Sequence, residues 1–272
     1  MTSKMDTQDS LATLNNVSQQ DEDNEDLASM SLMDHLEELR WRIFKVLIVV
    51  VIGSTIAFFF RNWLIKLLEA PLPDTANFLG LKTGHPLVVT GLTEGFTTYL
   101  LISIVAGTII ALPVLLYQTW AFIAPGLYEH EKKHAVPFVF IGLMLFVVGI
   151  TLGYIVLRYP IQWLVDFASD SFTPLVTAGS YFSFVAVFIL VFGLIFELPL
   201  VLTFLARFGL VSKETLQTKR AVSHIIMWVV ATFATPGADP YSPIILGIVM
   251  SFLYELTIIF IHLFVKPESL EA

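Results

Sequence analysis

The side chains most able to do chemistry in this sequence are histidines and glutamates that stand beside or inside apolar segments. His130, Glu131 and His134 form the pattern H-E-x-x-H, which on a helix places two imidazoles on one face for zinc and supplies a general base. Pro125-Gly126 interrupts any helix just upstream of this pattern. Lysines occupy its two intervening positions, and no third metal ligand is evident. The pattern fits either a zinc protease or a cytoplasmic loop that only fixes membrane topology, and the sequence favours the loop.

Two further glutamates interrupt apolar runs. Glu197 stands in LIFELPLV and Glu255 in FLYELTII. A charge near the centre of a bilayer costs about 2.5–3.5 kcal/mol on insertion scales, so such a carboxyl must be protonated, paired or open to a wet cavity. We interpret Glu197, close to Pro199, as functional; the alternative is a protonated carboxyl bonded to a neighbouring helix. If both glutamates carry protons, the chain is a proton-coupled secondary transporter.

The segment MSLMDHLEELRWR, residues 30–42, places charged side chains directly before an apolar run. Ser31 and Asp34 have the spacing of a capping box, so we expect a helix to begin here. Glu38 and Arg42 are then one turn apart, and an intrahelical pair of this kind contributes only about 0.3–0.5 kcal/mol. The segment is either a solvated helix beside the membrane or a site where a carboxylate receives a cationic ligand.

Membrane spans must position these residues. Hydrophobic residues make up 56% of the 272 residues and charged residues only 14%, which is far from the composition of a soluble domain. Several charge-free runs are long enough to cross a bilayer, which takes about 20 residues of helix. We expect an all-α membrane protein with six transmembrane helices, of which the last two are short. The expected spans are 43–63, 96–121, 135–157, 180–206, 220–234 and 242–263.

Prolines and charges refine this prediction. Pro113, Pro137 and Pro199 lie in or near spans, where each removes a backbone donor and kinks its helix, so we expect a bent, concave bundle. Ten Lys and Arg residues near the span ends fall on one side of the membrane and four on the other, which predicts that both termini are cytoplasmic. Asp239, between two prolines in the short turn TPGADPYSP, fits an Asx turn.

The acidic charge of the chain is concentrated at its beginning. Residues 1–34 hold eight acids and one lysine, whereas the remainder is nearly neutral. We expect 1–30 to be a disordered acidic cytoplasmic tail, 31–264 the membrane domain, and 265–272 a short cytoplasmic tail. The first tail has no apolar core, so it is not a secretory signal. There is no cysteine, P-loop, dinucleotide fingerprint or Ser–His–Asp constellation. We expect neither an enzyme nor a cofactor, and no nucleic-acid partner.

Four motifs in order along residues 31–264 resemble the TatC family, the multispanning receptors of the twin-arginine protein translocase. They are DHLEELRWR, LPVLLYQTWAFIAPGLYEHEKK, FELP and TPGADPYSP. The resemblance implies a glove-shaped, six-span receptor in a bacterial plasma membrane or a thylakoid or organellar membrane. It also implies export of folded proteins, driven by the proton gradient, with single-span TatA/TatB-type partners and further copies of the chain in one complex.

The resemblance also implies roles for particular residues. Glu38 and Glu131 match the glutamates that bind the paired arginines of signal peptides. His35, Arg40, Phe122 and Pro125 belong to the same motifs and are expected to shape that site. Glu197 matches a buried glutamate that faces the single-span partners, and Pro71, Pro113 and Asp239 match structural or partner-contacting positions. One departure is Pro243, which follows Ser242 where the family has a glutamine.

Overall fold

The structure is a computed structural model that describes residues 33, 35–73, 87–123, 135–169, 171–172, 175–207 and 211–264. The two tails and the loop that contains Pro125, His130, Glu131 and His134 lie outside the described residues. Contacts divide the chain into two units, Met1–Ile48 and Val49–Ala272, and each is described by itself.

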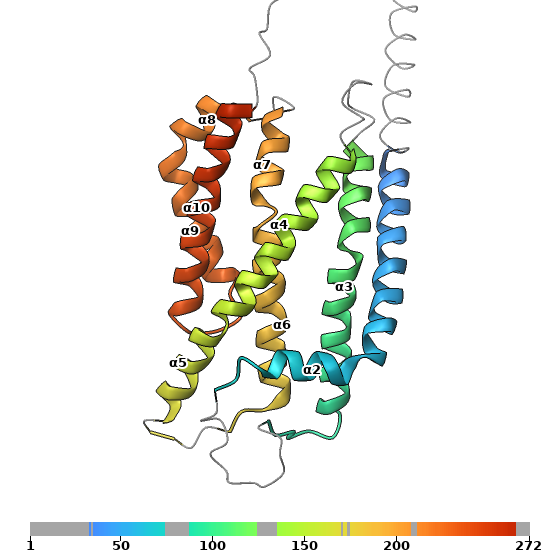
Figure 1. Cartoon of the computed structure of the whole chain (residues 1–272), viewed down its shortest axis with the longest axis vertical. Coiled ribbons are helices and arrows are strands. Elements are labelled where there is room, and N and C mark those ends of the chain that lie inside the picture. The colour runs from blue at the N-terminus through green and yellow to red at the C-terminus, as the bar shows by residue number, and fades with distance from the viewer. Residues whose placement is uncertain are drawn as a thin grey trace, which may run out of the picture. The chain divides into compact units, whose positions relative to one another are not determined.

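The first helix, His35–Phe59, joins the charged segment to the first apolar run without a break. The predicted span 43–63 is therefore wrong at its far end, where the chain turns at Phe60 and begins α2 (Arg61–Glu69). The α2 helix is amphipathic and ends just before Pro71. It lies crosswise to α3 (Figure 1). The proline explains this end, since its ring and missing N–H do not allow a helix to continue.

The middle of the chain forms α3 (Glu94–Ile123), α4 (Ala135–Val156), α5 (Arg158–Ser169), α6 (Ala178–Ile195) and α7 (Leu198–Arg207). The last part forms α8 (Lys213–Thr218), α9 (Arg220–Ala234) and α10 (Tyr241–Phe264). Regular β-structure within the described ranges is limited to one isolated bridge, between Val88 and Thr177. These bounds agree with the predicted spans 135–157, 220–234 and 242–263.

Five helical stretches of the described residues are long and apolar enough to cross a membrane. They are His35–Phe59, Glu94–Phe122, Val136–Ser169, Ala178–Arg207 and Tyr241–His262. The sixth predicted span, α9, is also apolar but has only 15 residues. At 1.5 Å per residue it extends about 22 Å, which is less than the ~30 Å of a hydrocarbon core.

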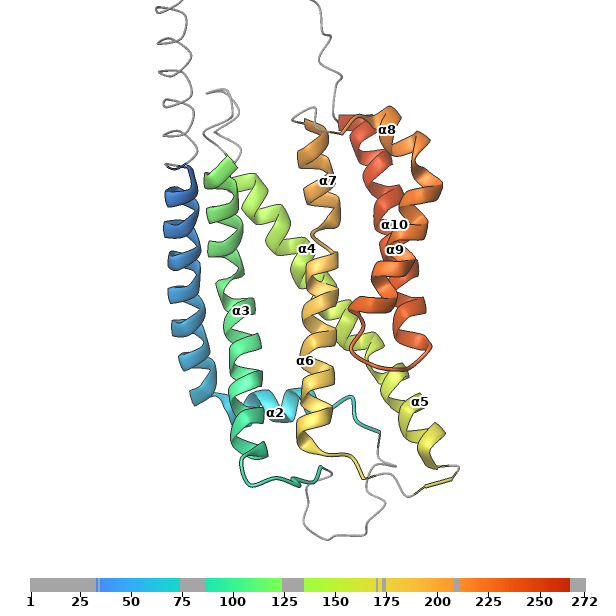
Figure 2. The same cartoon turned by 180° about the vertical axis from the view of Figure 1, so that it is seen from behind.

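Helix α6 lies at the centre of the second unit. Both views place the α6–α7 column between α3 on one side and α9 and α10 on the other, with α4 crossing it diagonally and continuing as α5 (Figure 1 and Figure 2). Val185, Phe188 and Phe192 of α6 are almost completely buried, as is Leu246 of α10. Their packing forms the main core of the unit.

Glycines allow α4 and α6 to approach closely. A Cβ atom on Gly149 of α4 would lie 2.7 Å from the Phe192 carbonyl oxygen and 2.8 Å from the Phe196 Cβ. A Cβ on Gly193 of α6 would lie 2.7 Å from the Phe146 ring. Helices in a bilayer associate through such packing, because lipid supplies no hydrophobic drive between them.

The three prolines have different positions in their helices. Helix α3 contains Pro113 and continues through it, so a kink there stays a prediction, whereas Pro137 lies in the first turn of α4, where its missing N–H costs nothing. Pro199 follows the break between α6 and α7 at Phe196 and Glu197. There the Glu197 amide donates to Leu194, three residues back, so the predicted span 180–206 consists of two helices.

Two tyrosines tie α2 to the bundle. The Tyr154 hydroxyl of α4 donates to the Leu67 carbonyl, and the Tyr181 hydroxyl of α6 donates to the Leu68 carbonyl, both over 2.7 Å. The last carbonyls of a helix have no partner within the helix, so these bonds satisfy groups that would otherwise need water. They hold the crosswise α2 against the ends of two spanning helices.

We expect Tyr181→Phe to lower the free energy of unfolding by about 1 kcal/mol, because it removes one hydrogen bond without opening a cavity. For a chain of this size the midpoint of thermal unfolding in detergent should fall by about 2–4 °C. Tyr117→Phe is the matched control, since Tyr117 is 54% exposed and its hydroxyl has no hydrogen bond within the described ranges. Equal midpoints for the two variants would contradict the anchoring role of Tyr181.

Candidate functional site

Glu38 lies on the first helix, one turn before Arg42. Arg42 donates from Nε to Glu38 Oε1 over 3.0 Å, and from Nη2 to the same oxygen. The Glu38 side chain is 36% exposed, and Oε2 accepts no hydrogen bond from a described residue. The predicted intrahelical pair is therefore present, and it leaves one carboxylate oxygen available to a ligand.

The other residues expected at the signal-peptide site are only partly placed. His35 and Arg40 are exposed on the first helix, and Phe122 is half-buried near the end of α3. Pro125 and Glu131 lie outside the described residues. The structure therefore positions Glu38 on its helix and does not test its pairing with Glu131.

Glu197 is buried at the break between α6 and α7. Its side chain is 8% exposed, and neither carboxyl oxygen has a hydrogen-bond partner within the described residues. A Cβ on Gly142 of α4 would lie 3.2 Å from Glu197 Oε2 and 2.8 Å from Leu116 of α3, so the carboxyl group faces α4 among apolar side chains. The alternative of a carboxyl bonded to a neighbouring helix is not observed among these residues.

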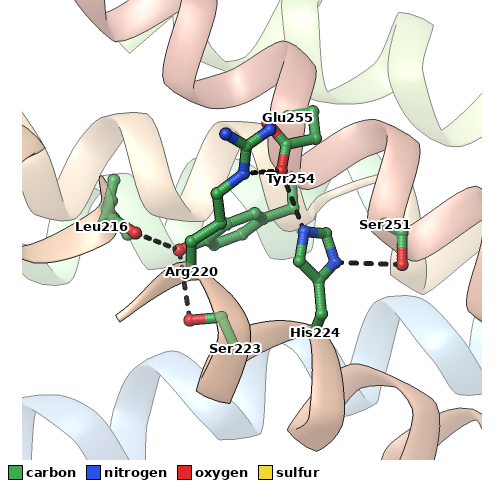
Figure 3. Close-up of polar contacts among 7 residues, drawn as sticks. All are labelled: Leu216, Arg220, Ser223, His224, Ser251, Tyr254 and Glu255. Carbon is green, nitrogen blue, oxygen red and sulfur yellow. Dashed lines mark hydrogen bonds and ion pairs between the residues drawn. The ribbon is translucent and has the colours of Figure 1, made fainter. Parts of the chain in front are cut away.

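Glu255 of α10 belongs to a polar cluster with α9. Arg220 donates from Nε to Oε1 over 2.6 Å and from Nη2 to Oε2, and His224 Nε2 lies 2.9 Å from Oε1 (Figure 3). His224 Nδ1 lies 3.2 Å from the Ser251 hydroxyl. This pairing offsets the cost of a carboxylate in α10, and it leaves the transporter interpretation without its second free proton site.

Asp239 begins α10. Its Oδ1 accepts from the Ser242 amide and its Oδ2 from the Ser242 hydroxyl, both over 2.7 Å, and both residues are buried. Acceptance from a residue three positions later is a helix cap, so the prediction of an Asx turn is replaced by a cap. A Cβ on Gly237 would lie 2.6 Å from the Phe184 ring and 2.8 Å from Asp239 Oδ2, so a larger residue there would displace these side chains.

Sequence reasoning missed Glu94 at the start of α3. Its Oε2 accepts from the Thr90 and Gly91 amides over 2.7 and 3.1 Å, and its Oε1 accepts from the Gly179 amide over 2.8 Å. The carboxylate therefore joins the beginnings of α3 and α6. The spacing of Gly91 and Glu94 is that of a capping box and could have signalled the first half of this contact.

Metal ligation has no support in the described part of the chain, where no group of three or more His, Cys, Asp or Glu side chains could hold an ion. The H-E-x-x-H histidines lie outside it. The described residues thus define a multi-span α-helical membrane protein with an isolated buried carboxyl and a half-exposed carboxylate near the start of the first helix.

Comparisons with known proteins specify this class. Residues 34–248 match the model of the family described as Sec-independent protein translocase protein (TatC). The TatC of Desulforapulum autotrophicum is 40% identical over 87% of this chain and 86% of its own length. The TatC of Aquifex aeolicus is 34% identical over 84% of this chain and 93% of its own. This chain belongs to the TatC family.

A solved structure agrees with the fold. A crystal structure of the twin arginine translocase receptor TatC in DDM is similar with a TM-score of 0.70 and 33% sequence identity. The similarity covers 83% of this chain and 98% of that chain. The predictions of an all-α membrane fold and of a protein-transport component are confirmed.

Proposed function

We propose that this protein is the receptor of a twin-arginine translocase. It binds the paired arginines of signal peptides and nucleates assembly of TatA/TatB-type subunits, and the proton gradient drives export of folded cargo. Two similar crystal structures are described as twin arginine translocase receptors, which supports the proposal. The observation that carries it is the half-exposed Glu38 carboxylate, whose Oε2 has no hydrogen bond from a described residue.

The chemistry of the ligand follows from this carboxylate. A guanidinium presents two parallel N–H groups that match one carboxylate, and such charge-assisted pairs are about twice as strong as neutral hydrogen bonds. Arg42 contacts Oε1 of Glu38 and not Oε2. An arginine of a signal peptide can therefore bind Oε2 or displace Arg42 from the carboxylate. We assign the second arginine to Glu131, with His35, Arg40, Phe122 and Pro125 shaping the site.

The topology belongs to the same proposal. We assign the six spans to the first helix, α3, α4–α5, α6–α7, α9 and α10, of which five are long enough to cross a membrane. The excess of Lys and Arg on one side supports cytoplasmic termini. Glu38 then lies on the side from which cargo arrives. The short α9 either crosses a bilayer that is locally thinned or begins below the membrane interface.

The buried Glu197 is the proposed contact for a single-span partner. Both of its oxygens lack partners among the described residues, and an unsatisfied buried carboxyl costs more than about 1–3 kcal/mol. A polar group on a partner helix that reaches this carboxyl would recover that cost on assembly. The energetic gain explains how partner binding can be favourable inside the bilayer.

Photocrosslinking of a twin-arginine signal peptide to membranes that contain the protein tests the proposal. We expect Glu38→Gln and Glu131→Gln each to raise the half-saturating peptide concentration by about tenfold or more, since a charge-assisted bond contributes about 1.5–3 kcal/mol. Glu37→Gln is the matched control, because Glu37 is an exposed neighbour of Glu38 on the same helix.

Two outcomes would contradict the proposal. Undiminished crosslinking in both Glu38→Gln and Glu131→Gln would remove the site assignment. Uptake of a small solute by vesicles that contain only this purified chain would support the secondary transporter instead, because a receptor alone should move nothing.

A further inference from the structure

Arg220 at the start of α9 has a side that faces away from its ion pair. Glu255 accepts hydrogen bonds from Nε and Nη2 of Arg220, whereas Nη1 has no hydrogen bond to a described residue. The Arg220 side chain is 58% exposed. The preceding residue, Lys219, is also exposed and lacks such a bond. Two exposed cationic groups are therefore adjacent in the chain where α9 begins, and Figure 3 shows Arg220 with its ion pair.

The other charges of the described residues around the start of α9 do not cancel them. Lys213 of α8 contacts His262 Nδ1 of α10, so a third cation lies nearby. Glu214 is the acidic residue of α8, and its own backbone amide and the Ser212 hydroxyl lower the pKa of its carboxyl, which keeps it charged. Glu255 is already occupied by Arg220 and His224, so Lys219 and the outer edge of Arg220 retain positive potential.

A shallow, open apolar groove lies on the surface of α9 and begins at His224, one turn after Arg220. It has a volume of about 370 Å³ and is lined by His224, Ile225, Trp228, Val229 and Thr232. His224, Trp228 and Thr232 follow Arg220 at intervals of four residues, so they form one stripe along the helix. The groove is open, since Ile225, Trp228 and Val229 are 41–65% exposed.

We propose that this cation pair and groove bind one anionic phospholipid. Its phosphate contacts Arg220 and Lys219, and one acyl chain lies in the groove against Trp228. The occupant follows from charge and shape together: basic pockets at the membrane surface attract anionic headgroups, and an apolar groove that leads from the cations into the bilayer fits a hydrocarbon chain. The proposal does not depend on signal-peptide binding.

The length of α9 explains why a lipid would be held here. Its 15 residues extend about 22 Å, so it is shorter than the hydrocarbon core. A short span draws its flanking residues toward headgroup depth or thins the bilayer locally. A phosphate bound at Arg220 would stabilise that thinning, because the lipid gains ionic contacts where the bilayer is deformed.

Quenching of Trp228 fluorescence by brominated lipids tests the proposal. The protein is the full chain with its other four tryptophans replaced by phenylalanine, reconstituted in phosphatidylcholine bilayers. Dibrominated phosphatidylglycerol is compared with equally brominated phosphatidylcholine. We expect half-maximal quenching at a lower fraction of the anionic lipid, by about fivefold for each cation that contacts the phosphate.

Three variants make the test specific. Lys219→Gln breaks no described contact and should reduce the preference about fivefold, and Lys219→Gln with Arg220→Gln should abolish it. Arg158→Gln, an exposed arginine at the start of α5, should leave it unchanged. Equal quenching by both lipids in the parent protein, or a preference that survives the double substitution, would overturn the proposal. Absence of quenching by either lipid would also overturn it, because protein would then cover the groove.

Discussion

Gly149→Ala is expected to destabilise the protein by about 3 kcal/mol, although it adds a single methyl group. The new Cβ would lie 2.7 Å from the Phe192 carbonyl oxygen and 2.8 Å from the Phe196 Cβ. Backbone cannot rotate away as a flexible side chain does, so α4 and α6 must separate, and overpacking of this kind costs about 1–3 kcal/mol or more. The midpoint of thermal unfolding in detergent should fall by about 6–12 °C.

Gly95→Ala is the matched control for this prediction. Gly95 lies in the first turn of α3, and a Cβ there would have no atom within 4 Å. Alanine also favours helix over glycine, so this variant should unfold at the same temperature as the parent or slightly higher. Equal stability of Gly149→Ala and Gly95→Ala would contradict the close approach of α4 and α6.

Glu197→Met is expected to make the isolated protein more stable and to abolish its assembly with single-span partners. Methionine is unbranched and has a similar length, so it fits the same space among Leu116, Gly142 and Leu200. It removes a buried carboxyl whose oxygens have no partner within the described residues, which should raise the free energy of unfolding by about 1–3 kcal/mol. Under the proposed function the same carboxyl is the contact for the partner helix, so stability and assembly change in opposite directions.

Two measurements on the same preparation check this prediction. Thermal unfolding of the chain purified alone reports stability, and copurification of single-span subunits reports assembly. Glu197→Gln is the control: it keeps a polar group at the same place, so it should show no gain in stability and should retain part of the assembly. A loss of stability in Glu197→Met would mean that the carboxyl has a structural partner.

The residues differ in how far their roles could be predicted. The spans 135–157, 220–234 and 242–263 nearly coincide with α4, α9 and α10, because the boundaries of an apolar run depend only on neighbouring residues. The predicted end of the span 43–63 is four residues beyond the end of the helix at Phe59, because the apolar sequence continues through the turn at Phe60 into the amphipathic α2. The division of span 180–206 at Glu197 has a local cause in Pro199, which could have been recognised.

Side-chain partners could not be predicted in the same way. Glu255 and Arg220 are 35 residues apart, and Glu94 and Gly179 are 85 apart, so their contacts depend on the register and crossing of packed helices. The sequence placed Glu197 and Glu255 alike inside apolar runs, and only packing distinguishes the unpartnered carboxyl from the ion-paired one.

The sequence by itself determined that this protein is a multi-span helical membrane protein, and its motifs indicated the TatC family. Hydrophobic length and motif order are properties of the linear chain, so they need no folded structure to be read. The tertiary structure decided which glycines permit the approach of α4 and α6, which carboxyl lacks a partner, and where α9 presents cations beside an apolar groove. These features depend on distances between helices, which arise only when side chains far apart in the chain pack together.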